Sequence, residues 1–130
     1  MNKRSIKTSL ICTELQFVVP AMLVYILNRL IKDSITLPII GYLCRCHLND
    51  FIGGGVFLAY VNILLIISKR KPSHTLRFAL IISLLASICW EYIAPLCLWY
   101  STSDFWDVVS YMLGALFYFS IIKINAKEKS

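Results

Sequence analysis

Charged residues are scarce in this chain of 130 residues. Asp, Glu, Lys and Arg make up only 15% of it, whereas 58% is apolar and the mean hydropathy is +0.72. A typical soluble domain is about 25% charged and about 45–50% apolar, and a small domain has too little interior to bury such an excess. The composition therefore excludes an ordinary soluble enzyme, a disordered tail and a fibrous protein, and indicates an integral membrane protein.

The sequence also lacks the signatures of familiar catalytic and metal sites. It contains neither a G-x-S-x-G nucleophile motif nor an H-E-x-x-H zinc motif. Its five cysteines are odd in number and have apolar neighbours, which argues against a disulfide framework. Cys44, Cys46 and His47 offer only three local donors, at a spacing unusual for structural zinc. We predict no metal and no cofactor, and we leave enzymatic activity open while favouring a protein that is not an enzyme.

Four apolar runs are long enough to cross a bilayer, which requires a helix of about 20 residues. They cover about residues 10–30, 51–68, 78–100 and 105–122. Short links join the last three runs and make neighbouring helices antiparallel. Residues 34–44 form an apolar run that is too short to cross, so we expect an interfacial or re-entrant segment there. The prediction is an all-α membrane protein, with four transmembrane helices in an antiparallel bundle and one domain over residues 1–130.

Basic residues exceed acidic ones by 13 to 7, and they gather in clusters between the apolar runs. The N-terminal tail holds three, the link at residues 69–77 holds four and the C-terminal tail holds three. The other side of the predicted membrane keeps only Arg29, Lys32 and Arg45. Cytoplasmic segments of membrane proteins are rich in Lys and Arg, so we predict that both termini are cytoplasmic. This clustering suits anionic lipid headgroups and argues against a nucleic-acid partner.

The polar residues that this topology leaves on the outer side converge. Asn49 and Asp50 precede the second span, Glu91 interrupts the third, and Asp107 lies in the first turn of the fourth. An ionisable residue within a span costs about 2.5–3.5 kcal/mol on insertion scales, so it should face the bundle and have a partner. We therefore predict a ligand site centred on Glu91, Asp107 and Asp50 with Asn49 beside it. Arg45 could bind a phosphate or carboxylate with its planar guanidinium.

Two further features, the capping residues of the fourth span and the glycines of the second, favour a structural role. Ser103 or Asp104 can cap the fourth helix, and Asp107 favours the positive N-terminal end of its dipole. Gly53–Gly55 opens the second span, and glycines in membrane helices usually mark close packing against a neighbouring helix. The alternative is a notch that lets a ligand approach the backbone.

Residues 49–119 carry a pattern that joins these features. Glu91 is followed by a short outer link, then by Asp107 and by Gly114 seven residues further on. In this pattern, and in Asp50 near the start of a span, the chain resembles the VanZ-like family of small bacterial membrane proteins. That family often has a glutamine where this chain has Ala94.

The resemblance implies a multi-pass protein of the bacterial plasma membrane that acts in the cell envelope. The named family member is linked to low-level resistance to the lipoglycopeptide teicoplanin. We therefore expect this chain to bind an amphiphile from the extracytoplasmic side without covalent catalysis. The candidates are a lipid, a lipid-linked cell-wall precursor and a lipoglycopeptide antibiotic.

Three other functions remain open at the level of the sequence. The first is an enzyme acting on a lipid headgroup, with Glu91 and Asp107 as acid and base. The second is a small oligomeric transporter, and the third is a purely structural subunit in which every polar group is a packing contact.

Overall fold

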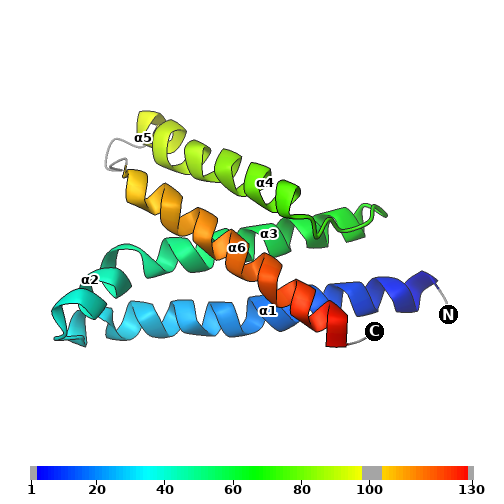
Figure 1. Ribbon diagram of the computed structural model, residues 1–130, viewed down its shortest axis with the longest axis horizontal. Coiled ribbons are helices and arrows are strands. Elements are labelled where there is room, and N and C mark those ends of the chain that lie inside the picture. Colours follow the sequence, from blue (N-terminus) through cyan, green and yellow to red (C-terminus); the bar gives the residue numbers. More distant parts are fainter. Residues whose placement is uncertain (1–2, 98–103, 129–130) are drawn as a thin grey trace.

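The computed structural model describes residues 3–97 and 104–128, and the regular elements in these ranges are helices (Figure 1). In chain order they are α1 (Lys3–Ile31), the 3-10 turn η1 (Lys32–Ser34), α2 (Pro38–Cys46), α3 (Leu48–Ile67), α4 (Leu76–Ile88), the π-helical turn η2 (Cys89–Ile93), α5 (Ala94–Cys97) and α6 (Phe105–Glu128). The turn η2 joins α4 and α5 into one continuous helical stretch.

Four of these stretches are long and apolar enough to cross a membrane: Arg4–Ser34, Leu48–Ile67, Leu76–Cys97 and Phe105–Lys127. The predicted all-α fold with four spans is therefore confirmed. The first stretch extends beyond residues 10–30 at both ends, and its helix continues through Pro20. The short apolar segment after it contains α2, which begins with a proline in the first turn, where no backbone N–H is needed.

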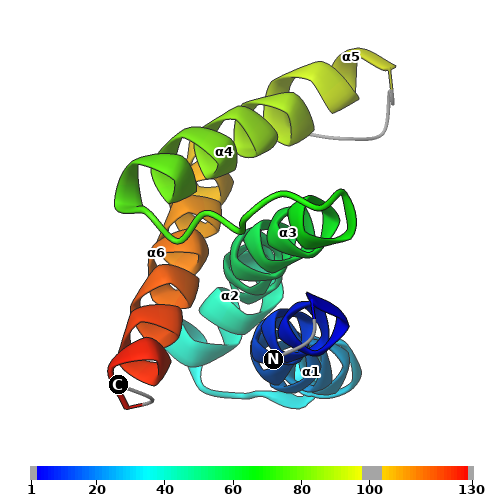
Figure 2. The same ribbon diagram turned by 90° about the vertical axis from the view of Figure 1, so that its right-hand side faces the viewer.

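The four membrane-crossing stretches pack mainly in the order α1, α3, α6 and α4. α3 and α6 cross at the centre, α1 packs on α3, and α4 packs on α6, so that α1 and α4 lie on opposite outer sides (Figures 1 and 2). The start of α1, the link between α3 and α4, and the end of α6 share one end of the molecule, which we call the terminal end. The other end holds α2, α5 and the start of α6, and we call it the α2 end.

The two central helices touch through their backbones. A Cβ atom on Gly54 would overlap the carbonyl oxygen of Tyr111, and one on Gly114 would overlap that of Phe51. The expectation that glycines of the second span mark close helix packing is confirmed, and Gly114 is their counterpart on α6.

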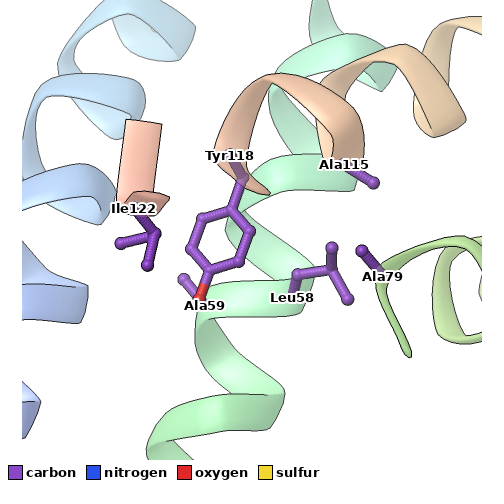
Figure 3. Packing of buried hydrophobic residues seen from close by; sticks show 6 residues of the cluster. All are labelled: Leu58, Ala59, Ala79, Ala115, Tyr118 and Ile122. Carbon is purple, nitrogen blue, oxygen red and sulfur yellow. The ribbon is translucent and has the colours of Figure 1, made fainter. Parts of the chain in front are cut away.

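The distribution of polarity is the reverse of that in a soluble protein. The buried apolar cluster is small: Leu58, Ala59, Ala79, Ala115, Tyr118 and Ile122. Figure 3 shows Tyr118 pointing from α6 toward Ala59 on α3. The buried polar side chains are Glu14, Asn28, Asn62, Ser83, Ser87 and Glu91, whereas many leucines and isoleucines are exposed. A surface of this kind is stable only in contact with lipid, so the chain is a multi-pass membrane protein.

Candidate functional site

Three carboxyl groups lie near one another at the α2 end. Asp50 comes from the first turn of α3, Glu91 from the turn η2 and Asp107 from the first turn of α6. The charges of Glu91 and Asp107 both reach Asp50. His47, the residue between α2 and α3, lies 3.0 Å from Asp107 through its Nδ1 and the Oδ1 of the aspartate. We call Asp50, Glu91 and Asp107 the carboxylate cluster.

Glu91 fastens the third span to the start of α6. The wider π-helical turn carries the Glu91 side chain inward, where only 8% of the residue is exposed. Its Oε2 accepts the backbone N–H of Asp104 at 3.2 Å. Asp104 in turn accepts the backbone N–H of Trp106 at 3.0 Å and so caps α6. Ser103, the other predicted cap residue, lies outside the described residues.

Asn49 and Arg45 have different surroundings. Asn49 accepts a hydrogen bond from Asn28 of α1 at 3.0 Å, and the same Asn28 amide donates to the carbonyl of Cys44 at 2.8 Å. These bonds join α1, α2 and α3 beside the carboxylate cluster. Arg45 is exposed, and its guanidinium lies over Gly41 on its own helix. The structure therefore brings Asn49 together with the three predicted carboxyl groups and leaves Arg45 on the surface of α2.

An open groove of about 710 Å³ runs from Asp50 along the gap between α3 and α4. Its lining is mostly apolar and comes from four spans: Tyr25, Asn49, Asp50, Gly53, Phe57, Val61, Ile82, Leu85, Ala86, Cys89, Trp90 and Tyr111. Asn49 and Asp50 lie at the α2 end of this groove, and Val61 and Ile82 lie at its opposite end. We call it the α3–α4 groove. It combines an apolar channel open to lipid with a polar, acidic end.

The donors present do not form a metal centre within the described ranges. No three His, Cys, Asp or Glu side chains there are placed to hold one ion. The cysteines, including Cys44 and Cys46, are free thiols.

A second polar network, at the terminal end, was missed by sequence reasoning. Glu14 of α1 is fully buried, and both of its oxygens have partners. Oε2 accepts the hydroxyl of Tyr118 at 2.6 Å, and Oε1 lies 2.7 Å from Nε2 of His74. Asn62 donates to the same hydroxyl at 2.8 Å and accepts the backbone N–H of Ser73 at 2.8 Å. The sequence did contain one sign of this network, because Glu14 lies inside an apolar run. An acidic residue in such a run needs a buried partner.

Comparison with protein-family models, with curated proteins and with solved structures finds no match for this chain. The resemblance to the VanZ-like family stays a prediction, and the function has to be inferred from the carboxylate cluster and the α3–α4 groove.

Proposed function

We propose that this protein binds an amphiphile in the α3–α4 groove. The headgroup lies against Asp50, with Asn49 and Tyr111 beside it. The alkyl chain follows the apolar walls past Phe57 and Leu85. The bound molecule is held without covalent chemistry.

The observation that carries this proposal is the position of the acidic residues at one end of an apolar groove. The charges of Glu91 and Asp107 act on Asp50, which itself lines the groove. In a medium of low dielectric constant, neighbouring carboxylates repel an anion and stabilise a cation or a hydrogen-bond donor. The geometry therefore favours a headgroup with a protonated amine or several hydroxyl donors. It disfavours a headgroup whose only polar group is an anion.

Binding is better supported than acid–base catalysis on a headgroup. Glu91 is engaged by the backbone of Asp104, and Asp107 is engaged by His47. The groove is lined by Asp50 rather than by these two carboxyls. Catalysis would require both groups to reach the bound headgroup directly.

The resemblance to VanZ-like proteins supports a finer proposal. It favours a protein of the bacterial plasma membrane, and the distribution of Lys and Arg favours cytoplasmic termini with the α2 end facing outward. The amphiphile would then be a component of the envelope or a lipoglycopeptide that inserts its alkyl chain from outside. Arg45 does not line the groove, so the recognition of an anionic group, such as the phosphate of a lipid-linked precursor, has less support than the recognition of an amine.

Trp90 lines the groove, so its fluorescence can report the binding of a ligand there. We would replace Trp99 and Trp106 by phenylalanine, purify the full chain in a nonionic detergent and titrate dodecylammonium while following Trp90 fluorescence. We expect a saturable change that dodecanesulfonate, with the same chain and the opposite charge, does not produce. Asp50→Asn should raise the Kd for dodecylammonium about tenfold, since a hydrogen bond to a charged group is worth about 1.5–3 kcal/mol.

Asp33→Asn is the matched control, because Asp33 is an exposed aspartate in η1 outside the groove. An equal response of both variants, or equal binding of the sulfonate, would reject the proposal. The finer proposal is tested by adding teicoplanin as a competitor. Displacement of dodecylammonium by the antibiotic would support it, and a failure to compete would reject the antibiotic as the ligand while leaving the groove assignment intact.

A further inference from the structure

A separate cavity of about 500 Å³ lies at the terminal end, between the start of α1 and the end of α3. Four of its lining residues are basic: Arg4, Lys7, Lys69 and Arg70. The others, Ile6, Leu10 and Ile66, are apolar. We call it the basic cavity. It shares no lining residue with the α3–α4 groove, so a ligand bound there is independent of the proposed function.

The basic cavity lies at the ends of two helical stretches that are long and apolar enough to cross a membrane. The first membrane-crossing stretch begins at Arg4, and the second ends at Ile67. The amine of Lys7 donates to the carbonyl of Ile67 at 3.4 Å, which joins the two helix ends. The ends of membrane-crossing helices lie at the level of the phospholipid headgroups, with acyl chains on one side and water on the other.

Backbone hydrogen bonds fix the turn after α3, which carries Lys69 and Arg70. The N–H of Lys69 donates to the carbonyl of Ile66 at 3.1 Å, and that of Arg70 donates to the carbonyl of Leu65 at 2.8 Å. Lys69 has a φ of 61°, the left-handed conformation that ends many helices. The turn therefore folds back over the end of α3 and directs two consecutive basic residues toward the start of α1.

Charge is strongly divided between the two ends of the molecule. Nine of the 12 basic residues that the structure describes belong to segments of the terminal end, namely the start of α1, residues 69–77 and the end of α6. At the opposite end lie five acidic side chains: Asp33, Asp50, Glu91, Asp104 and Asp107. At the terminal end, Glu128 is the last residue of α6, and Glu14 is fully buried against His74 and does not line the cavity. The basic cavity is thus set in a positive environment.

We propose that the basic cavity binds the phosphate of an anionic phospholipid from the adjoining leaflet. Lys7, Lys69 and Arg70 surround the phosphate, and one acyl chain descends past Leu10 and Ile66. The apolar residues decide between a lipid and a soluble phosphate, because a free phosphate would leave the apolar half of the cavity unused. An anionic lipid satisfies both halves at once.

The test is a binding titration of the full chain in nonionic detergent, followed by native mass spectrometry. The probes are phosphatidylglycerol, phosphatidylcholine and glycerol 3-phosphate. The cavity variant is Lys7→Gln/Lys69→Asn/Arg70→Gln, in which asparagine is chosen at position 69 because it tolerates a positive φ. The control is Arg77→Gln/Lys123→Gln/Lys127→Gln, which removes the same charge from the same end outside the cavity.

We expect saturable binding of phosphatidylglycerol that the cavity variant weakens about tenfold or more and the control barely changes. Phosphatidylcholine and glycerol 3-phosphate should bind at least tenfold more weakly to the wild type. Equal weakening by both triple variants would overturn the proposal in favour of general attraction to a positive surface. Tight binding of glycerol 3-phosphate would overturn the commitment to a lipid. Circular dichroism of each variant shows that a loss of binding is not a loss of fold.

Discussion

Tyr118 links three helices through a single hydroxyl group. The hydroxyl donates to Glu14 of α1 at 2.6 Å and accepts from Asn62 of α3 at 2.8 Å, while its own ring lies in the buried cluster on α6 (Figure 3). Glu14, Asn62 and Tyr118 are all buried, so water has little access to replace either bond. The hydroxyl is therefore expected to matter more for stability than its size suggests.

We predict that Tyr118→Phe lowers the free energy of unfolding by about 2 kcal/mol or more. The change leaves the buried Oε2 of Glu14 without its hydrogen-bond partner, and an unpaired buried polar group costs about 1–3 kcal/mol. It also removes the shorter of the two hydrogen bonds that the Asn62 amide donates, the other going to the carbonyl of Ser73 at 3.4 Å. Reversible unfolding in mixed micelles, followed by circular dichroism, measures the change. Tyr60→Phe makes the same deletion on α3, where 53% of the residue is exposed, and should be nearly neutral. Equal effects of the two substitutions would show that the network contributes nothing particular.

The two polar networks differ in how far the sequence predicts them. Asp50, Glu91 and Asp107 could be grouped in advance, because each stands near the same end of an apolar run. Glu14 could be recognised as needing a partner, but not paired with His74, which lies 60 residues away in a link between helices. Periodicity describes one helix at a time, whereas this pairing depends on how the link folds back over the bundle.

At the level of whole elements, the crossing of α3 and α6 depends on the absence of side chains at two glycines. We predict that Gly114→Ala destabilises the fold by about 1–3 kcal/mol or more, because its Cβ would overlap the carbonyl oxygen of Phe51 and force the helices apart. Reversible unfolding in mixed micelles measures this loss as well.

Gly53→Ala is the internal comparison for this crossing. A Cβ on Gly53 would meet only the ring of Tyr111, at 3.4 Å, which is ordinary contact. The gain in helix propensity, about 1 kcal/mol, should make this substitution neutral or slightly stabilising. If both alanines destabilised equally, the crossing would depend on the backbone flexibility of glycine rather than on contact between the helices.

Some properties of the elements were accessible from the sequence and others were not. Length and hydropathy identify four spans, since a bilayer imposes a minimum helix length. They do not reveal that α1 begins at Lys3, because a helix can extend past the apolar run once its backbone is hydrogen-bonded. They also give no sign of the π-helical turn that carries Glu91. One extra residue in a turn changes the direction of a side chain without changing the composition.

On the scale of the whole molecule, the two binding surfaces have opposite electrostatic character. The α3–α4 groove ends in acidic residues at the α2 end, and the basic cavity opens at the terminal end. This separation follows from the distribution of charge along the sequence, which antiparallel spans sort to two sides. The order in which the helices pack, α1 on α3, α3 on α6 and α6 on α4, could not be predicted from the distribution of charge. Which helix faces which depends on the glycine contacts between α3 and α6 and on the gap left between α3 and α4.

The same division of charge predicts how the protein lies in the membrane. Moving a positive charge outward against the membrane potential costs about 2.3 kcal/mol for each 100 mV, so the end with ten basic residues should stay in the cytoplasm. In a chain whose five cysteines are replaced by alanine, we predict that Asp33→Cys at the α2 end reacts with an impermeant maleimide in intact cells. Lys127→Cys at the terminal end should react only after permeabilisation. The reverse pattern would place the acidic end of the groove in the cytoplasm and would contradict access of the amphiphile from outside.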